Sequence, residues 1–260
     1  MKKIYIPTLG RADNQITYNN LPQKLKDITT LVIQKHEVGL YDYPCDYHVV
    51  DDHIGIAKTR ELIYRLAGNS RYLVIDDDMF FKRRNAKYWG KSSNMEKSKR
   101  NFIESDWDDM LINFNKQHDK GITICGCRQV GLPPTGKQYF KTGGIYGIYS
   151  IEGDYLMNII DNINFSLCQY NVGMEDVYFN MSVLNNGHTM IKFDEFVFDS
   201  KIDTKGGIGG DRKVLEGITS IKNKFPNYIT ISKDDPLKYR INWQKIMKES
   251  QSNSLSLNYE

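Results

Sequence analysis

A chain of 260 residues can form one large domain or two small ones and can bury an ample hydrophobic core. The formal net charge is only +3, which excludes a general affinity for nucleic acid, so any basic surface must be local. The four cysteines show no C-x-x-C spacing and are typical of free thiols in a reducing cytosol. The chain starts without the apolar segment of a signal peptide, and no stretch approaches the roughly 18 apolar residues of a membrane span. We therefore expect a soluble cytoplasmic protein without a membrane partner.

The amino-terminal part of the chain alternates strand-like and helix-like segments. Short apolar runs at 3–6, 30–33 and 47–50 each stop at polar or turn-forming residues, which predicts strands. The stretch 54–67 has an apolar face and is followed by Gly68, so we expect a helix that ends at this glycine. Strands that alternate with helices indicate an α/β fold, with a mixed, mainly parallel sheet flanked by helices.

Three consecutive aspartates follow the next apolar run, residues 72–75. Ligands of open α/β sheets bind beyond the carboxyl ends of the strands, which is where Asp76, Asp77 and Asp78 are expected to lie. Adjacent carboxylates repel one another unless a cation lies between them, and Asp76 and Asp78, as alternate residues, can turn toward one ion. Mg²⁺ or Mn²⁺, held by these two carboxylates and by substrate phosphates, fits such a site. The alternative is a solvated turn after a strand.

A basic, aromatic segment follows the aspartates directly. Residues 80–100 contain one acid, Glu96, among many lysines and arginines, including Lys82, Arg83 and Arg84. Because the segment has no helical or strand period, we expect a mobile loop. It is either a solvated insertion or a contact surface for a polyanion, where cations meet phosphates and aromatic rings stack on bases.

The middle of the chain continues the alternation. We expect helices at 101–118 and 152–163 and strands at 121–126, 138–149, 190–193 and 195–199. Within 138–149, the paired glycines Gly143 and Gly144 leave room for a ligand to approach the backbone.

An acidic pair, Glu175 and Asp176, begins a predicted helix that ends at Gly187. The pair either complements the positive end of the helix dipole or contains a general base that takes a proton from an attacking hydroxyl. His188 follows the helix, where a surface or hydrogen-bonded histidine is commoner than a ligand.

Three basic residues near strand ends, Arg11, Lys58 and Arg60, can clamp phosphates, although exposed basic residues are common. Residues 1–200 are expected to form one domain. Residues 201–260 are expected to pack on that domain as an extension, with a glycine-rich flap at 206–210 and helices at 213–225 and around Trp243.

Together these segments resemble a glycosyltransferase of the GT-A fold, close in pattern to the large inverting family 2. The resemblance rests on four motifs in the right order across residues 3–200. They are Ile6-Pro7-Thr8-Leu9-Gly10-Arg11, Gly55-Ile-Ala-Lys-Thr-Arg60, Leu73-Val-Ile-Asp76-Asp77-Asp78 and Gly173-Met-Glu175-Asp176. The second resembles the family's G-x-x-x-A-R-N, with Glu61 where asparagine is frequent, the third resembles D-x-D, and the fourth resembles the E-D motif.

The resemblance implies an SN2-like, inverting transfer of a sugar from a nucleotide-sugar such as a UDP-sugar. The implied substrate-binding residues are Pro7, Thr8, Arg11, Lys58, Arg60, Asp76, Asp77, Gly143 and Gly144. Asp76 and Asp78 would hold Mn²⁺ or Mg²⁺, with His188 completing the metal site. Asp176 would deprotonate the acceptor, and Glu175 would help to position it.

Small, membrane-free versions of this pattern are similar to phage glycosyltransferases that decorate hydroxymethylated pyrimidines in DNA. That similarity implies an enzyme of the host cell cytoplasm that binds DNA through residues 80–100 and flips out the acceptor base. A polysaccharide or protein acceptor is the alternative. A metal-dependent nucleotidyltransferase and a non-catalytic binding module are further alternatives, whereas the missing P-loop motif argues against a kinase or ATPase.

Overall fold

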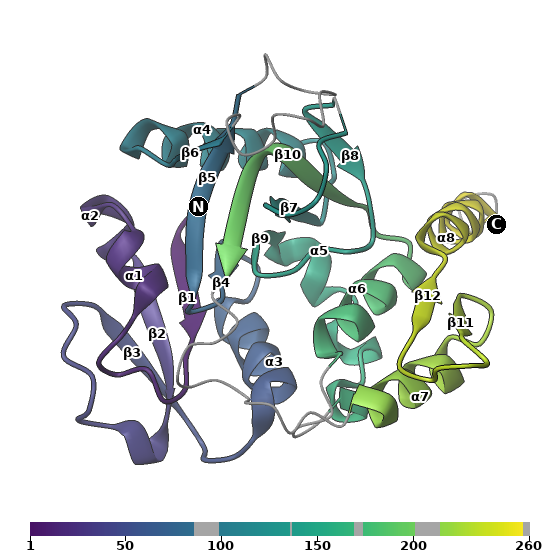
Figure 1. Cartoon of the computed structure of the whole chain (residues 1–260), viewed down its shortest axis with the longest axis horizontal. Helices are drawn as coiled ribbons and strands as arrows, with labels where there is room; N and C mark the ends of the chain where they lie inside the picture. Colours follow the sequence, from purple (N-terminus) through teal and green to yellow (C-terminus); the bar gives the residue numbers. More distant parts are fainter. Residues whose placement is uncertain (86–98, 136, 169–173, 201–213, 257–260) are drawn as a thin grey trace.

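The structure is a computed structural model of residues 1–260 that describes the chain except residues 86–98, 136, 169–173, 201–213 and 257–260 (Figure 1). Its centre is one mixed β-sheet. The strands are β1 (Lys3–Pro7), β2 (Thr29–Gln34), β3 (Asp46–Val50), β4 (Arg71–Ile75), β5 (Met79–Arg84), β6 (Lys99–Asn101), β7 (Ile124–Gln129), β8 (Tyr139–Lys141), β9 (Ile148–Glu152) and β10 (Met190–Ser200).

The strands lie in the order β3-β2-β1-β4-β9-β7-β10-β5-β6, and β8 also pairs with β10. Strands β3, β2, β1 and β4 are parallel to one another, and β7 is parallel to β10. Strand β9 is antiparallel to β4 and β7, and β5 is antiparallel to β10. The predicted mixed α/β sheet is confirmed, and the carboxyl ends of β1, β2, β3 and β4 share one edge of it.

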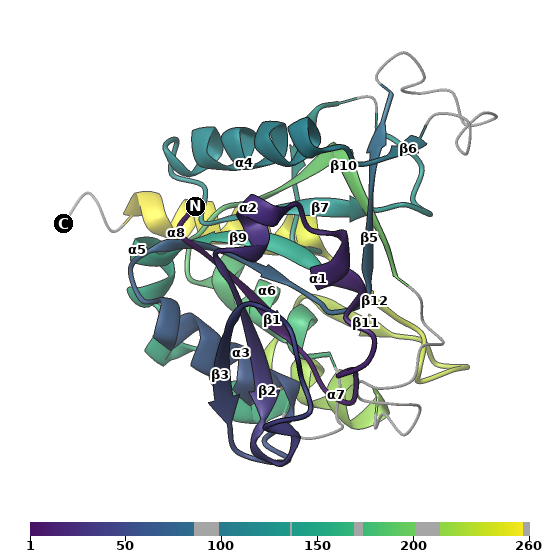
Figure 2. The ribbon, with the colours of Figure 1, turned by 90° about the vertical axis from the view of Figure 1, so that its left-hand side faces the viewer.

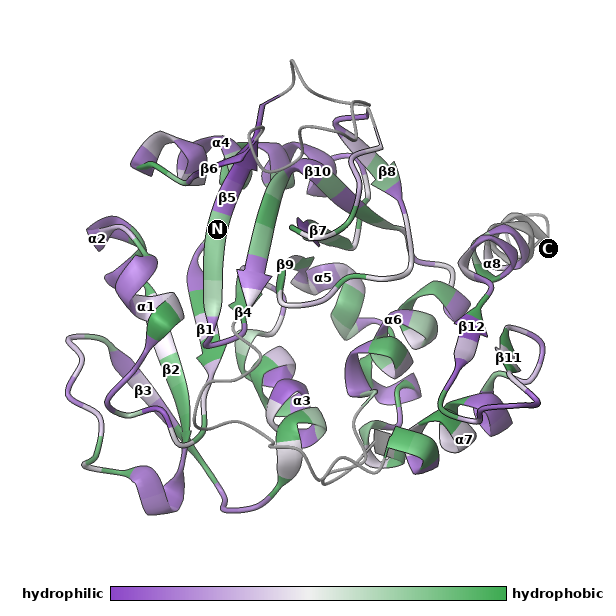
Figure 3. Cartoon of the chain, in the orientation of Figure 1, coloured by the Kyte–Doolittle hydropathy of each residue, from purple (hydrophilic) through white to green (hydrophobic). Residues whose placement is uncertain are grey.

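Helices cover both faces of the sheet (Figures 1 and 2). They are α1 (Ile16–Asn20), α2 (Gln23–Lys26), α3 (Gly55–Ala67), α4 (Glu104–His118), α5 (Gly153–Met157), α6 (Glu175–Asn185), α7 (Val214–Lys224) and α8 (Trp243–Ser256), with short 3-10 helices η1 (Lys35–Glu37), η4 (Ile160–Asn162) and η5 (Phe165–Cys168). One apolar core joins the sheet to α1, α2 and α4, and the other joins it to α3, α5, α6, α7 and α8. Hydrophobic residues accordingly gather on the inner strands and on the inward sides of the helices (Figure 3).

Part of the basic segment is a strand, which corrects the expectation of a loop over all of residues 80–100. Residues Met79–Arg84 form β5, between β10 and β6. The Arg84 side chain is 2% exposed, and its Nη1 lies 2.6 Å from Oδ1 of the fully buried Asp194. Nη1 of Arg83 lies 2.8 Å from Asp106 Oδ1 and 2.6 Å from Asp109 Oδ2. Both arginines are therefore paired with acids of this chain. Residues 86–98, the rest of the expected loop, lie outside the described residues.

The segment predicted as one strand, 138–149, is divided between β8 and β9. Gly147 has a φ of +73°, a conformation that favours glycine, and the turn it makes begins β9. Strand β9 ends at Glu152, so the helix expected over 152–163 is reduced to α5 and the short η4.

The carboxyl-terminal residues pack on the face of the sheet that α6 covers. Strands β11 (Ile229–Ile231) and β12 (Tyr239–Ile241) form a hairpin between α7 and α8. Ile221, Phe225 and Ile246 belong to the same buried core as α6. The expected flap at 206–210 lies outside the described residues. In the part of the chain that is described, no helix is long and apolar enough to cross a membrane.

Candidate active site

A cavity of about 420 Å³ lies at the carboxyl ends of β1, β2, β3 and β4. We call it the donor cavity, after the nucleotide-sugar donor that the sequence resemblance leads us to expect there. Its lining residues come from these strand ends and from the first turns of α3 and α6: Pro7, Thr8, Leu9, Arg11, Val32, Gln34, Val50, His53, Gly55, Ile56, Thr59, Arg60, Asp76, Asp77, Asp78 and Glu175. Four motifs that are far apart in the sequence therefore meet in one cavity, as the strand-end argument predicts.

The three aspartates occupy a short turn between β4 and β5 that is held from several sides. The Asp76 amide donates to the carbonyl of Gly147 at 2.8 Å. The Thr17 hydroxyl donates to the carbonyl of Asp76 at 2.5 Å and accepts from the Met79 amide at 2.9 Å. The backbone under the carboxylates is thus fixed by hydrogen bonds.

Asp77 contacts the loop after β1, and Arg11 of that loop also lies 3.5 Å from Asp78 Oδ2. The Asp77 carboxylate accepts hydrogen bonds from Thr8 Oγ1 at 2.7 Å and from Arg11 Nη1 at 2.5 Å. Burial raises the pKa of Asp77 to about 7, although the Arg11 guanidinium opposes that rise. Asp77 therefore acts by holding Thr8 and Arg11 in place.

Arg60 bridges the aspartate turn and the acidic pair. Its Nη2 lies 2.8 Å from Asp76 Oδ1, and its Nη1 lies 2.9 Å from Glu175 Oε1. The Arg60 side chain is 9% exposed, so both contacts are shielded from water. Arg60 lines the donor cavity, as expected, but its guanidinium is shared by two carboxylates.

A second cavity, of about 380 Å³, lies on the other side of Glu175. It is lined by Tyr146, Met174, Glu175, Asp176, Val177, Val214 and Tyr239. Burial, and then repulsion from the Glu175 carboxylate, raise the pKa of Asp176 to about 7. A carboxylate with such a pKa can take and hold a proton near neutral pH.

Four of the predicted site residues, Lys58, Gly143, Gly144 and His188, line neither cavity. Lys58 lies 2.7 Å from Glu61, its side chain is 43% exposed, and it does not line the donor cavity. Trp243 fills the space above Gly143, where a Cβ would lie 2.0 Å from the indole ring. Gly144 packs against the Tyr146 hydroxyl. The two glycines therefore admit side chains of this chain rather than a ligand.

His188 also lies away from the aspartates, which corrects its expected place in a metal site. Its Nδ1 is 2.9 Å from the Thr123 hydroxyl, just before β7 and β10 begin. The Thr123 carbonyl accepts from the amide of Glu152, which pairs with Arg71 at the start of β4. Asp76 follows the other end of that strand, about 15 Å away at the rise of a β-strand. The histidine and the aspartates are thus at opposite edges of the sheet.

The carboxylates that are present fit a sparse cation site. In the part of the chain that the structure describes, no group of three or more His, Cys, Asp or Glu side chains forms a complete metal site. Asp76 and Asp78 face the donor cavity, with side chains that are 29% and 18% exposed. Two carboxylates, with diphosphate oxygens and water in the other positions, are the ligands that Mg²⁺ usually takes beside phosphates.

Several lining residues were not predicted from the sequence. Gln34 and His53 lie at the ends of β2 and β3, and a strand-end argument extended to all four strands would have found them. His53 has a φ of +59°, a strained conformation for a residue with a Cβ. Tyr146 and Tyr239 give no signal in the sequence, because neither belongs to a motif or follows a predicted strand.

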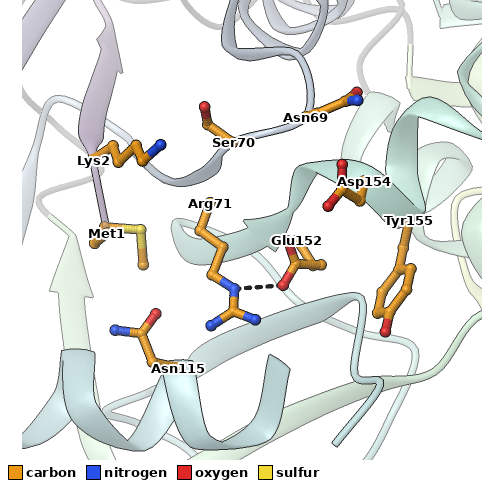
Figure 4. A pocket seen from close by; sticks show the side chains of 9 residues that line it. All are labelled: Met1, Lys2, Asn69, Ser70, Arg71, Asn115, Glu152, Asp154 and Tyr155. Carbon is orange, nitrogen blue, oxygen red and sulfur yellow. Dashed lines mark hydrogen bonds and ion pairs between the residues drawn. The ribbon is translucent and has the colours of Figure 1, made fainter. Parts of the chain in front are cut away.

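A larger cavity, of about 580 Å³, lies at the amino-terminal edge of the sheet and contains no motif residue. Arg71 and Glu152 form an ion pair within it, and Asn69, Ser70, Asp154 and Tyr155 line one side (Figure 4). Its charges are balanced, and ligands of α/β sheets bind at the opposite edge. Volume alone therefore does not identify the active site.

Solved structures share this fold. GalNAc-T7, solved with UDP, GalNAc and Mn²⁺, matches with a TM-score of 0.55 at 9% identity, over 85% of this chain and 47% of its own. The mannosyltransferase PcManGT from Pyrobaculum calidifontis, solved with GDP-Man and Mn²⁺, matches with a TM-score of 0.52 at 12% identity, over 86% of this chain and 64% of its own. The chain thus spans less than two thirds of either protein. These likenesses show that the chain has a fold of the GT-A type.

The family follows from the sequence itself. Residues 2–207 match the model of the TET-Associated Glycosyltransferase family. The chain belongs to this family and is a glycosyltransferase enzyme, which decides against a nucleotidyltransferase or a non-catalytic module. No curated protein matches the sequence closely enough to count as a relative.

Proposed function

We propose that the enzyme transfers a sugar from a nucleotide-sugar, such as a UDP-sugar, to an acceptor hydroxyl with inversion at the anomeric carbon. One observation carries the proposal: Glu175 is part of the wall of both cavities, and Arg60 joins it to Asp76. The diphosphate would lie beside Asp76 and Asp78, and the acceptor would lie beside Asp176.

Asp176 would take the proton from the acceptor hydroxyl, and Glu175 would help to orient that hydroxyl. The acceptor oxygen then attacks the anomeric carbon while the bond to the diphosphate oxygen breaks. Negative charge gathers on the departing nucleoside diphosphate. A bound Mn²⁺ or Mg²⁺ offsets such charge, and Asp76 and Asp78 are the residues that would hold it. Arg11 and Arg60 add fixed positive charge at the cavity wall.

We further propose 5-hydroxymethylpyrimidine in DNA as the acceptor, in the cytoplasm of the cell in which the enzyme acts. The family's association with TET is compatible with this acceptor. Because Arg83 and Arg84 are paired with acids of the protein, any contact of the basic segment with DNA would depend on Lys82 and on residues 86–98. A polysaccharide or protein acceptor is the competing outcome of the test.

The test begins with the donor alone. The enzyme is incubated with a panel of sugar nucleotides and Mn²⁺, and the release of nucleoside diphosphate is measured. We expect chelator and Asp78→Asn to abolish release, whereas Asp176→Asn, which keeps the donor side intact, should retain it. Asp46→Asn, at a 67% exposed side chain outside both cavities, is the control and should behave as the unchanged enzyme. Release that survives both chelator and Asp78→Asn would refute the metal assignment.

The acceptor is tested by mass spectrometry of DNA with and without 5-hydroxymethylpyrimidine after incubation with each active donor. A mass increase of one sugar only in the hydroxymethylated DNA is the expected result. Donor turnover without this increase, together with transfer to a glycan or protein, would overturn the DNA acceptor and leave the donor assignment standing.

A further inference from the structure

The cavity beside Asp176 is built from distant parts of the chain. Tyr146 lies between β8 and β9, Asp176 begins α6, and Tyr239 begins β12. Val214 and Tyr239 lie beyond residue 207, where the match to the family ends. The cavity therefore combines Asp176, which lies within the residues that match the family, with residues that follow this match. We call it the acceptor cavity.

The two tyrosines are held in place from outside the cavity. The Lys192 ammonium lies 5.5 Å from the centroid of the Tyr146 ring, and Gly144 leaves space for the Tyr146 hydroxyl. The Tyr239 hydroxyl donates to Sδ of Met174 at 3.3 Å, and its backbone pairs with Ile231 of β11. Both rings are thus fixed before a ligand arrives.

Tyr146 and Tyr239 line the same cavity as Asp176. Burial raises the pKa of Tyr146 and of Tyr239, and the negative charge of Asp176 adds to the rise in each case. The hydroxyls therefore stay protonated at neutral pH, when the carboxylate beside them can carry a charge. The aromatic rings give the cavity apolar surface next to a proton acceptor.

The charge and size of the cavity limit what can enter it. Its charged lining residues, Glu175 and Asp176, are both acidic. Arg60 pairs with Glu175 at 2.9 Å, and the Asp176 carboxylate repels a phosphate while an uncharged group is accepted. A volume of about 380 Å³ has room for a single ring with a hydroxyl arm but not for a stacked duplex. A nucleobase can enter only after it leaves the stack.

The attachment of the carboxyl-terminal residues makes Tyr239 a fixed part of this wall. Trp243, four residues after Tyr239, packs on the backbone of Gly143, and the fully buried Ile246 enters the core beside α6. The segment that directly follows Tyr239 is thereby anchored in the core.

We propose that the acceptor cavity binds an uncharged planar ring bearing a hydroxyl, the base of a hydroxymethylpyrimidine nucleotide, and that Tyr239 is a specificity-determining residue that packs on its face. This inference rests on the proposed function and adds the residues that select the acceptor. The family's region supplies the donor cavity and Asp176, and the carboxyl-terminal residues supply acceptor selection.

The test compares two substitutions at Tyr239. Tyr239→Phe keeps the aromatic face, and Tyr239→Leu removes it. The probe is a single-stranded oligonucleotide with one 5-hydroxymethylpyrimidine, and its affinity is measured by fluorescence anisotropy. We expect Tyr239→Leu to weaken binding about tenfold, the size of one lost base–aromatic stack, and Tyr239→Phe to stay within about twofold. Donor hydrolysis is measured separately in the unchanged enzyme, so that the donor reaction is verified apart from binding of the oligonucleotide.

The matched control is Tyr228→Leu, since Tyr228 precedes β11 and contacts Glu249 rather than the acceptor cavity. Equal affinity of Tyr239→Leu and the unchanged enzyme would overturn the inference, as would equal weakening by Tyr228→Leu. Active donor hydrolysis without binding of the oligonucleotide would overturn the nucleobase as ligand. Failure of donor hydrolysis in the unchanged enzyme would instead count against the proposed function.

Discussion

Arg60 and Asp76 are joined by an ion pair of 2.8 Å, although one belongs to a helix and the other to the turn after a strand. The second guanidinium nitrogen of Arg60 reaches Glu175 at 2.9 Å. One side chain therefore fixes the distance between a carboxylate of the donor side and a carboxylate of the acceptor side. A shift of either cavity relative to the other would break a shielded, charge-assisted hydrogen bond.

Replacing Arg60 tests this bridge. Arg60→Gln leaves Asp76 and Glu175 without their common cation, which costs about 2–5 kcal/mol when a buried charge pair is broken. We expect kcat/KM to fall by about 100-fold or more, with kcat affected as well as the KM for the donor. Arg60→Lys keeps the charge but has no second nitrogen to span both acids, so an intermediate loss is expected. Arg65→Gln, on the exposed side of α3, is the control. Full activity of Arg60→Lys would show that the bridge is dispensable.

The pH dependence of the reaction tests Asp176 as the base. Its pKa is raised to about 7 by burial and by Glu175, and a base works only when deprotonated. We therefore expect kcat/KM to decrease tenfold for each pH unit below about 7 and to level off above it. Asp77 has a raised pKa in the same range, so the profile is repeated with Asp77→Asn. If kcat/KM no longer decreases below pH 7 in this variant, the titrating group is Asp77 rather than Asp176.

Arg84 and Lys82 should respond differently to the loss of their charge. Arg84→Gln removes the nearer of two cations beside the fully buried Asp194, while Arg128 stays at 3.4 Å. The free energy of unfolding should fall by about 3 kcal/mol, the low end of the range for a broken buried ion pair. Lys82 lies 3.4 Å from Asp199 with a side chain that is 31% exposed, so Lys82→Gln should cost less than about 1 kcal/mol. Urea unfolding followed by circular dichroism measures both. Similar values would contradict the interior role of Arg84. Charge reversal for a DNA-binding test therefore belongs at Lys82.

Gly143 is expected to matter for stability rather than for donor binding. In Gly143→Ala the new methyl group would overlap the Trp243 ring, at a cost of about 1–3 kcal/mol in unfolding free energy, with no change in the KM for the donor. Gly131→Ala is the matched control, since no atom lies within 4 Å of its Cβ position. An increase in the KM for the donor without a loss of stability would instead support the expectation that Gly143 lets a ligand approach the backbone.

The donor cavity could be predicted because strand ends are a local property of sequence. An apolar run that stops at polar residues marks the end of a strand, and parallel strands place such ends together. Thr8, Arg11 and Asp76 were found in this way. Glu175 was found because an acidic pair before an apolar face marks a helix start.

The remaining features depend on contacts between distant residues. The sequence Lys82-Arg83-Arg84 predicts a loop because the acids that neutralise it are distant. Asp194, the partner of Arg84, lies 110 positions further along the chain. His188 lies just before β10, so its position depends on the edge of the sheet at which β10 begins. The order and direction of the strands determine that edge. Tyr239 reaches Asp176 only because the hairpin of β11 and β12 folds back beside α6. No local pattern in the sequence encodes such pairings.

The turn of three aspartates connects two strands of the same sheet directly, since β4 ends at Ile75 and β5 begins at Met79. Fixing a backbone residue costs about 1–2 kcal/mol of conformational entropy, and here that cost falls on folding rather than on binding. Under the proposed function, a cation arriving with the diphosphate would bind carboxylates that need no ordering, so more of its interaction energy would remain as affinity. Lengthening this connection by even one glycine would transfer the entropy cost back to the binding step.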